Sequence, residues 1–366
     1  MRVLILCAEV GEGHVTVART LADSLRTRPE VEAVSLRTDL EVMGPRFGRF
    51  MSRGFDTHLE DAGWSYELAY RVFFQMAAPR RAAHLALAAL GGRGLRQTIR
   101  EHQADVVVTE YPVLSAALGQ LRALGRVAVP VCSSISDPAG LYYWAHPGID
   151  LHLLSWPDAL AEVDRIAGPG KAAVVRPLID PRFHAAPPRG EARTALGLPA
   201  DGPVVLVSGG GWGLGDLSGA AERALQTIPG ATVVVLSGRN ARVQMALQAD
   251  HAQHPAVRVL GFTDQMPALL SAADAIVHTT GGTTALEARV VGCPLINFGT
   301  GVAHVRAHAR ALAEQGVAEW ARDGAALGPA LERTLARARP APLATDALPE
   351  AADLVLGVAA GHRPVA

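Results

Sequence analysis

The sequence predicts an α/β protein with two tandem Rossmann-like, doubly wound domains that face a shared cleft. Short apolar runs alternate with helical patterns along the chain, which is typical of βαβ units and a parallel sheet. The runs form two series. Each series opens with a strand that leads directly into a Gly-rich loop, at residues 11–14 and 209–215. Two doubly wound halves bind ligands at such loops.

Each series predicts its own strands. In the first, we expect strands at residues 3–8, 31–36, 106–109, 127–132, 151–154 and 174–176. In the second, we expect them at residues 204–208, 232–236, 257–260, 275–278 and 294–298. Residues 181–191 are rich in proline and lack periodicity, as a linker does. We therefore expect an N-terminal domain over residues 1–183, a C-terminal domain over 184–345, and a final helical segment, 346–366, that packs back on the first domain.

Composition restricts the class of function. Hydrophobic residues make up 49% of the 366 residues and charged residues 19%, as in a compact globular protein with about two cores. The net charge of −1 and the scarcity of aromatic residues argue against nucleic acid as a partner. Cys7, Cys132 and Cys293 show no metal-ligand spacing, so we expect buried thiols in a reducing compartment and no metal.

The apolar run at residues 1–8 superficially resembles the hydrophobic part of a signal peptide. It leads into Glu9 and a Gly loop without a cleavage site, so we expect a first buried strand. The sequence contains no apolar run of ~18 residues that could span a membrane. We expect a cytoplasmic protein, with peripheral contact to the inner face of the cell membrane as a further option.

Residues 276–288 carry the most informative functional signal. They comprise an apolar strand, a Gly-Gly loop with hydroxyls on both sides, and the first turn of a helix. The unpaired N–H groups of a helix start and the helix dipole favour a phosphate. Glu287 lies about one turn into the helix, where it can reach the group that the phosphate carries. Alternatively, the threonines only cap the helix.

The Gly-rich loop at residues 209–215 follows a predicted strand and precedes a helix. Its glycines let the backbone approach a ligand and offer N–H donors, although a ligand-free turn would also fit. The usual acidic ribose ligand ~20 residues further on is absent, and so is a Walker A lysine. The next strand ends in Ser237-Gly-Arg-Asn240 instead. The pattern therefore does not favour a nicotinamide dinucleotide.

His14 and Asp137 are the candidate catalytic residues. His14 follows a short Gly loop at the carboxyl edge of a predicted parallel sheet, and its near-neutral titration suits a general base. Asp137 ends another predicted strand and could orient His14 or bind an acceptor hydroxyl. Alternatively, His14 makes only local hydrogen bonds at the helix start, and Asp137 caps the turn before Pro138.

Residues 46–100 are mostly helical in pattern and more basic than the rest of the chain. They hold nine arginines against four acidic residues, with aromatic residues and methionines between them. Such a segment could lie on an anionic lipid surface or form an acceptor groove. Alternatively, the aromatic residues belong to the core and the arginines are solvated.

Together these motifs resemble a known family over most of the chain. In order and spacing they are similar to glycosyltransferases of the glycosyltransferase-B fold that include monogalactosyldiacylglycerol synthase, processive diacylglycerol glucosyltransferase and lipid-II GlcNAc transferase. The family's Gly-x-Gly-His corresponds to residues 11–14, and its Asp–Trp–His series to Asp137, Trp144 and His146. Its motifs in the second half correspond to residues 209–213, 238–240, 261–263 and 281–288.

The resemblance implies an inverting, metal-independent enzyme that moves a sugar from a UDP-sugar to a hydroxyl of a lipid, lipid-linked or natural-product acceptor. It implies no cofactor, because the UDP-sugar is a substrate. His14 or Asp137 would act as the base, and Glu287 would accept hydrogen bonds from the ribose. The donor would contact Gly209, Gly210, Gly211, Gly213, Arg239, Asn240, Phe262, Thr280, Gly281, Gly282, Thr283, Thr284, Glu287, His304 and His308. The acceptor would contact Gly11, Gly13, Tyr111, Trp144 and His146.

The chain departs from the family pattern at two places. Relatives carry Pro-Gly-Gln-Glu…Asn-Ala after the strand at 294–298, where Gln and Glu touch sugar hydroxyls. Here His304, Val305 and His308 stand at the Gln, Glu and Asn positions. In the first half, Leu141 and Ser136 stand where several lipid transferases have His and Thr. These changes concern the choice of sugar and acceptor.

Two other functions are compatible with the sequence. A UDP-GlcNAc 2-epimerase has the same fold, but it needs several acidic and histidine residues around the sugar and turns over without an acceptor. A non-catalytic nucleotide-sugar-binding protein would keep the Glu287 pocket and lack a working base.

Overall fold

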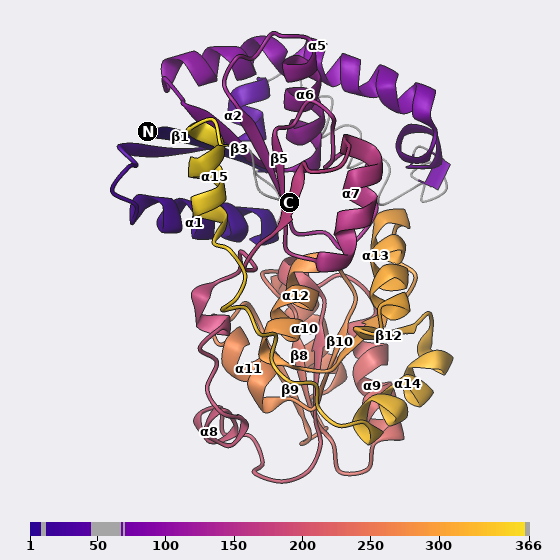
Figure 1. Ribbon diagram of the computed structural model, residues 1–366. Helices are drawn as coiled ribbons and strands as arrows, with labels where there is room; N and C mark the ends of the chain where they lie inside the picture. The colour runs from indigo at the N-terminus through magenta and orange to yellow at the C-terminus, as the bar shows by residue number, and fades with distance from the viewer. Residues whose placement is uncertain (9–11, 45–66, 69, 363–366) are drawn as a thin grey trace. The chain divides into compact units, whose positions relative to one another are not determined.

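A computed structural model describes residues 1–8, 12–44, 67–68 and 70–362 (Figure 1). The chain divides into two compact units. The first comprises Met1–Leu178, Val302–His304 and Thr345–Ala366, and the second comprises Ile179–Gly301 and Val305–Ala344. The chain thus leaves the first unit near residue 178 and returns to it near residue 345.

A six-stranded sheet forms the centre of the first unit, in the order β2-β1-β3-β4-β5-β6. All neighbouring strands are parallel. Valine, leucine and isoleucine dominate the central strands, which are almost wholly buried, as expected of a sheet that is covered on both faces. The strands are β1 (Arg2–Cys7), β2 (Ala33–Thr38), β3 (Val106–Glu110), β4 (Val131–Ile135), β5 (Leu151–Leu154) and β6 (Ala172–Val174).

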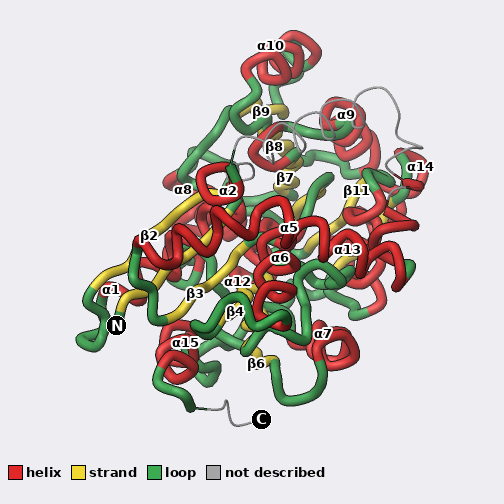
Figure 2. Tube along the Cα trace, turned by 90° about the horizontal axis from the view of Figure 1, so that it is seen from above, coloured by secondary structure: helices red, strands yellow, loops and turns green. Residues whose placement is uncertain are grey.

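Helices cover both faces of this sheet (Figures 1 and 2). On one face, α2 (Asp39–Met43), α5 (Ala77–Glu101) and α6 (Pro112–Ala123) share a core with Leu4 and Val107. On the other face, α1 (Glu12–Arg26) and α15 (Ala351–Ala359) pack with Ile5 and Val108. Successive strand residues point to opposite faces, which explains this division. Further helices of the unit are η1 (Arg71–Gln75), η2 (Pro157–Ala159) and α7 (Leu160–Ala167).

The second unit holds another six-stranded sheet, in the order β12-β11-β10-β7-β8-β9. Its neighbouring strands are also parallel. The strands are β7 (Val204–Ser208), β8 (Thr232–Leu236), β9 (Val257–Leu260), β10 (Ala275–His278), β11 (Leu295–Phe298) and β12 (Ala318–Ala321). Both units are doubly wound α/β structures, so the predicted fold class is confirmed.

The helices of the second unit also lie on both sides of its sheet. α9 (Leu217–Thr227) and α14 (Gly324–Ala336) pack on one hydrophobic core with β7, β8, β10 and β11. α11 (Met266–Ala272) contacts α12 (Gly282–Val291), and these helices contact β7 and β10, respectively. Its other helices are η3 (Pro181–Phe183), α8 (Arg189–Ala195), η4 (Gly210–Trp212), α10 (Ala241–Asp250) and α13 (Ala303–Glu314).

Each predicted strand overlaps an observed one, with two informative differences. β4 begins at Val131 rather than at residue 127, since Pro130 has no N–H to give to a ladder. β12 was not predicted. It is a short edge strand, Ala-Glu-Trp-Ala, whose side chains are mostly half-buried, so it lacks the apolar run that marks the central strands.

Three expectations about the ends and the thiols can be compared with the structure. The apolar N-terminal run forms the buried strand β1, as predicted. Cys7, Cys132 and Cys293 are free and buried, as predicted. Within the described residues, no helix has both the length and the apolar character that crossing a bilayer requires.

Candidate active site

Ligands of a doubly wound sheet bind at the carboxyl edge, where the strand order reverses. In the first unit, β1 lies between β2 and β3, so the chain winds in opposite directions from this point. In the second unit, β7 lies between β8 and β10 and creates the same arrangement. We therefore expect ligands to bind at the segments that follow β1, β3, β7 and β10.

His14 and Glu110 face each other at the reversal of the first sheet. His14 lies in the first turn of α1, and Glu110 ends β3. His14 Nδ1 is 4.0 Å from Glu110 Oε1. The Glu110 side chain is 1% exposed and the His14 side chain 26%, while the His14 Nδ1 atom itself is buried. A buried carboxylate therefore stands behind an imidazole whose other atoms reach the surface.

The charge of Glu110 changes the titration of His14. Burial disfavours the imidazolium, but the Glu110 carboxylate, helped by Asp137 and Asp39, outweighs it and raises the pKa of His14 above the ordinary 6.5. Burial also raises the pKa of Glu110, and His14 and Ser134 oppose that shift. A histidine with a raised pKa is a stronger base in its neutral form.

Two aromatic rings and Asp137 complete the surroundings of His14. The centroid of the Tyr111 ring lies 5.8 Å from that of His14, edge-on, and the Trp144 centroid lies at 5.7 Å. Trp144 Nε1 donates a 2.8 Å hydrogen bond to Asp137 Oδ2. The structure thus brings together four of the residues predicted for catalysis and acceptor binding. Of the predicted loop glycines, Gly13 lies in α1, and Gly11 falls outside the described residues.

Sequence reasoning missed Glu110. We placed an acid that could orient His14 at Asp137, whereas the carboxylate paired with His14 Nδ1 is that of Glu110. Asp137 acts on His14 through its charge and accepts the hydrogen bond from Trp144. One signal was available: an otherwise apolar strand ends in Thr-Glu at the carboxyl edge, where a buried acid has no packing role.

The second site surrounds the start of α12. Gly281 is the N-cap residue and Gly282 opens the helix. A glycine at the cap offers no side chain to the first-turn N–H groups, which have no acceptor within the helix. The cap position is therefore filled by glycine rather than by a threonine. The N–H groups of Gly282, Thr283 and Thr284 are suited to an anion.

The Gly-rich loop after β7 lies against the same segment. Gly210 has φ +66°, and a Cβ there would lie 2.6 Å from Thr280 Oγ1. Gly238 has φ +61°, and its Cβ would lie 2.3 Å from the Gly211 carbonyl oxygen. The Arg239 N–H donates to the same carbonyl at 2.8 Å. Only glycine fits such close approaches at positive φ. These contacts bring together the segments 209–213, 238–240 and 280–284, which were predicted to bind the donor.

Arg239, Asn240 and Phe262 border this loop. The guanidinium carbon of Arg239 lies 3.6 Å from the centroid of the Phe262 ring, which is 52% exposed. The Asn240 side chain caps α10 by accepting from Val243 N–H at 3.1 Å, and it donates to the Trp212 carbonyl at 3.4 Å. A planar cation on an exposed ring forms a flat surface of the kind that stacks on another ring.

Glu287 has an unusual titration. Burial raises the pKa of its carboxyl to about 8, with a smaller contribution from Asp180. At neutral pH the carboxyl without bound ligand is therefore mostly protonated, and donors such as hydroxyl groups would favour its charged form.

The two histidines predicted to contact the donor lie in α13. His308 is 5% exposed, and a Cβ on Gly281 would lie 3.9 Å from its Nδ1. His304 lies in the first turn of α13.

His146, which we predicted to contact the acceptor, belongs to a buried cluster of three histidines. It is 7% exposed, its Nδ1 accepts a 2.9 Å hydrogen bond from Gly148 N–H, and its ring centroid lies 5.4 Å from that of His84. Its own N–H donates to His152 Nε2 at 3.2 Å. Burial lowers the pKa of each of these histidines to about 4. These contacts give His146 a structural role, and acceptor contact stays a prediction.

We expect acid to destabilise the first unit through this cluster. The folded histidines stay neutral down to about pH 4, whereas their unfolded forms bind protons below about 6.5. The free energy of unfolding therefore falls as the pH drops from about 6.5 towards 4, by at most about 1.4 kcal/mol per pH unit for each site. Urea unfolding at a series of pH values measures this slope. A His84→Leu variant with the wild-type slope would contradict the explanation.

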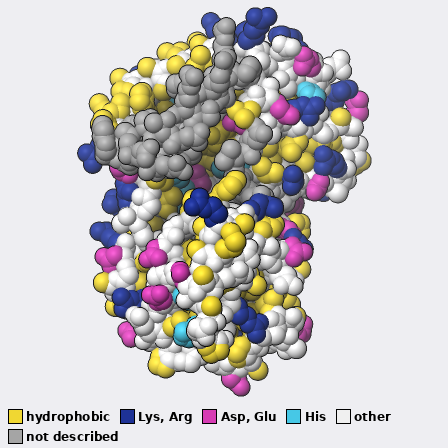
Figure 3. Space-filling view, turned by 180° about the vertical axis from the view of Figure 1, so that it is seen from behind, with side chains coloured by type: hydrophobic (Ala, Val, Ile, Leu, Met, Phe, Trp, Pro, Cys, Tyr) yellow, Lys and Arg dark blue, Asp and Glu magenta, His cyan; other side chains and the backbone are white. Residues whose placement is uncertain are grey.

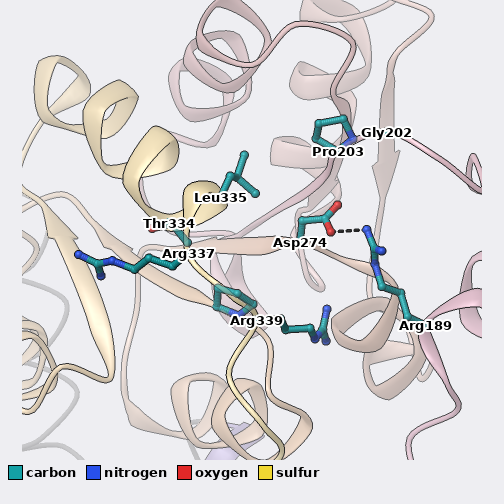
Figure 4. Close-up of a pocket in the computed structure, with 9 residues that line it drawn as sticks. Arg189, Gly202, Pro203, Asp274, Thr334, Leu335, Arg337 and Arg339 are labelled. Carbon is teal, nitrogen blue, oxygen red and sulfur yellow. Dashed lines mark hydrogen bonds and ion pairs between the residues drawn. The ribbon is translucent and has the colours of Figure 1, made fainter.

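The second unit also has a pocket at the opposite edge of its sheet, beside Pro203 and Asp274, which precede β7 and β10 (Figure 4). Its arginines are already engaged. Arg189 pairs with Asp274, Arg337 with a glutamate of β12, and Arg339 donates to backbone carbonyls. Because it lies away from the carboxyl edge and its cations are paired, we do not place the active site here.

Two family models match the parts of the chain that hold these two candidate sites. Residues 204–354 match the Glycosyltransferase family 28 C-terminal domain, a range that includes Gly209, Gly281 and Glu287. Residues 58–168 match monogalactosyldiacylglycerol (MGDG) synthase, a range that includes Glu110 and Asp137. Similarity to glycosyltransferases thus extends over both units of the chain, and solved glycosyltransferases share its fold. The predicted resemblance and the predicted enzyme class are therefore confirmed.

Three curated relatives illustrate the similarity of this glycosyltransferase. It is 24% identical over 317 residues to the processive diacylglycerol beta-glucosyltransferase of Bacillus subtilis, and this match covers 81% of this chain and 77% of the relative. It is 27% identical over 316 residues to the probable monogalactosyldiacylglycerol synthase 2 of Oryza sativa subsp. japonica, covering 80% and 65%. It is 34% identical over 177 residues to the pyrophosphoryl-undecaprenol N-acetylglucosamine transferase of Salinibacter ruber, covering 45% and 48%.

Solved structures share the fold. MurG of Acinetobacter baumannii has a TM-score of 0.55 at 18% identity and covers 97% of this chain and 99% of its own. The glycosyltransferase SnogD of Streptomyces nogalater has a TM-score of 0.55 at 19% identity, covering 98% and 99%. A putative UDP-N-acetylglucosamine 2-epimerase of Listeria monocytogenes reaches 0.62 at 13% identity, covering 100% and 98%. Transferases and epimerases share this fold, so the fold alone does not select the reaction.

Proposed function

We propose that this glycosyltransferase moves a sugar from a UDP-sugar to a hydroxyl group of a lipid or lipid-linked acceptor, with inversion and without a metal. The observation that carries the proposal is the pairing of the partly exposed His14 imidazole with the buried Glu110 carboxylate. A neutral imidazole can take a proton from a hydroxyl, and a carboxylate behind it stabilises the imidazolium that forms.

His14 would be the base, and Asp137 would position the acceptor. The acceptor oxygen gives its proton to His14 and attacks the anomeric carbon, while the bond from that carbon to the UDP oxygen breaks. A single displacement of this kind inverts the anomeric configuration. Asp137 accepts a hydrogen bond from Trp144, whose ring lies beside that of His14, and its carboxylate would contact a substrate hydroxyl there.

The second unit would hold UDP. The N–H groups at the start of α12 would take the diphosphate, whose charge grows as the sugar leaves. Glu287 would accept from the ribose hydroxyls, and the Phe262–Arg239 pair would border the uracil. Because fixed N–H dipoles can stabilise the departing charge, we expect transfer to continue in the presence of EDTA.

The acceptor class follows from the relatives and from α5. The relatives named above include a diacylglycerol glucosyltransferase and a probable monogalactosyldiacylglycerol synthase. Large apolar side chains of this region are exposed at Phe73, Met76, Leu85 and Leu90, and Figure 3 shows hydrophobic side chains gathered in this part of the molecule. Arginines are interleaved with them on α5. Apolar and basic side chains together favour peripheral contact with an anionic lipid surface. Residues 46–66 and 69 of the predicted basic segment fall outside the described residues.

A direct assay tests the proposal. The full chain is incubated with UDP-glucose, UDP-galactose or UDP-GlcNAc and with vesicles that contain diacylglycerol, and UDP and glycolipid are measured. We expect both products in equal amounts, with an inverted anomeric centre by NMR and no loss of rate in EDTA. Conversion of UDP-GlcNAc without vesicles would favour an epimerase. Transfer only to a water-soluble hydroxyl compound would replace the lipid acceptor by a natural product.

Replacing Glu110 by glutamine is expected to move the acidic limb of the pH profile of kcat/KM to lower pH. The wild-type rate falls as the pH drops through the raised pKa of His14, because a general base must be deprotonated. Glutamine removes the charge that favours protonated His14, so His14 would lose its proton at a lower pH. If both profiles share the same acidic limb, the electrostatic link from Glu110 to the rate is wrong.

A further inference from the structure

His278 lies directly beneath the loop that precedes α12. It is the last residue of β10, between Ser208 of β7 and Asn297 of β11 in the parallel ladders, and it is 1% exposed. Its Nε2 is 3.1 Å from the Gly281 carbonyl oxygen and 3.2 Å from Thr280 Oγ1. Neither the motifs nor the proposed reaction gives this buried polar side chain a role.

The protonation state of His278 determines what it can do for Gly281. Burial lowers its pKa to about 4, so the ring is neutral at physiological pH and carries one N–H. With that N–H on Nε2, the ring donates to the Gly281 carbonyl. The other tautomer would set a nitrogen lone pair against the carbonyl oxygen. The tautomer with the proton on Nε2 is the one that makes this hydrogen bond to Gly281.

Because the peptide between Gly281 and Gly282 is planar, the hydrogen bond to the Gly281 carbonyl also affects the direction of the Gly282 N–H. The described residues include no cis peptide, so the Gly281 carbonyl and the Gly282 N–H point in opposite directions. Since His278 holds the carbonyl towards the interior, the Gly282 N–H points outward. Gly282 is the first residue of α12, and its N–H has no acceptor within the helix. The orientation of the first anion-binding donor thus depends on a buried side chain.

A second anchor holds Thr279, two residues before Gly281, so the loop is fixed at two points. Thr279 N–H donates to the Ser208 carbonyl at 3.1 Å, and Thr279 Oγ1 donates to the Leu214 carbonyl in the Gly-rich loop. Between this anchor and α12, Gly281 has no Cβ to restrict its backbone. As an N-cap carbonyl, that of Gly281 also accepts the first hydrogen bond of the helix, so His278 adds a second restraint on the Gly281–Gly282 peptide.

We infer that His278 is a positioning residue that orients the Gly281–Gly282 peptide for binding the diphosphate of the donor. The inference rests on the proposed function, in which this loop binds UDP. The ring N–H of His278 holds the Gly281 carbonyl, and through the planar peptide it sets the direction of the Gly282 N–H on the opposite side. Its effect should therefore be specific to ligands that carry phosphate.

Three variants of His278 separate this role from simple packing. Glutamine places its amide N–H near the position of Nε2, asparagine places its amide near Nδ1, and leucine has no donor. His251→Leu is the matched control, because His251 is 7% exposed in the same unit and its ring contacts Ser218 on α9. Titration calorimetry of each variant with UDP and with uridine gives the dissociation constants, and circular dichroism shows whether each variant is folded.

We expect His278→Leu and His278→Asn to weaken UDP binding about tenfold, the effect of one hydrogen bond, and uridine binding less than about twofold. His278→Gln should stay within about threefold of the wild type for both ligands. Backbone amides of residues 279–284 should exchange faster in the leucine and asparagine variants without ligand. His251→Leu should change neither affinity.

Four results would overturn the inference. Unchanged UDP binding in His278→Leu would refute it and leave the proposed function intact. Equal weakening of UDP and uridine would show a general structural role. If His278→Leu does not fold, loss of UDP binding in both His278→Gln and His278→Asn would refute the inference. If the wild type binds no UDP, the proposed function and the inference both fail.

Discussion

Replacing His14 by alanine is expected to lower the rate of sugar transfer by about 10²–10⁴-fold, the usual contribution of a general base. Alanine removes the only proposed acceptor for the hydroxyl proton and leaves Glu110 buried without its partner. The proposed donor site lies in the second unit, so donor binding should not change. Initial rates with a saturating UDP-sugar measure the loss, and the dissociation constant of UDP serves as the internal control.

An Asp137→Asn variant distinguishes the two candidate bases. Asparagine can still accept the hydrogen bond from Trp144 Nε1, so the surroundings of His14 are preserved. We expect Asp137→Asn to raise KM for the acceptor more than it lowers kcat. If Asp137→Asn abolishes transfer while His14→Ala retains it, the base is Asp137 and our assignment is wrong.

Replacing Glu287 by alanine is expected to weaken UDP binding by about 10–100-fold. Hydrogen bonds to a charged group contribute about 1.5–3 kcal/mol, and the ribose hydroxyls would lose their acceptor. The free carboxyl has a pKa of about 8, so wild-type affinity should rise between pH 6 and 8 as the charged form becomes accessible. Calorimetric titration with a UDP-sugar across this pH range measures both effects, because a UDP-sugar lacks the terminal phosphate of UDP, which itself titrates near pH 6.

Glu287→Gln and Glu222→Ala are the controls for this result. Glutamine cannot ionise, so the pH dependence should disappear even where some affinity remains. Glu222 is exposed on α9, and its replacement should leave both the affinity and its pH dependence unchanged. A Glu287→Gln variant that keeps the wild-type pH dependence would show that another group titrates.

The sequence predicted the fold and the positions of the Gly-rich loops well, because these depend on local patterns. Buried parallel strands read as apolar runs, and glycines at positive φ such as Gly210 and Gly238 mark loops that nothing else can form. β12 was missed because a half-buried edge strand lacks the apolar run on which such predictions depend.

The features that sequence reasoning did not predict all depend on contacts between distant segments. Glu110 meets His14 only because β1 and β3 are neighbours in the sheet. The motif of the family includes His146, yet its ring lies against His84 of α5, which no local pattern could indicate. His278 reads as one more residue of an apolar strand until its Nε2 is seen opposite the Gly281 carbonyl.

The return of the chain to the first unit has a consequence for how the protein is made. Ala351, Ala352, Val355 and Val358 of α15 belong to the hydrophobic core that β1 and α1 begin. The ribosome must therefore complete the whole second unit before that core can close, and until then the α1 face of the first sheet lacks part of its cover. A fragment that ends at residue 178 should accordingly aggregate when expressed alone, and a peptide of residues 345–362 supplied in trans should restore its solubility. Cutting this chain at the apparent boundary between its units would not yield two independent domains.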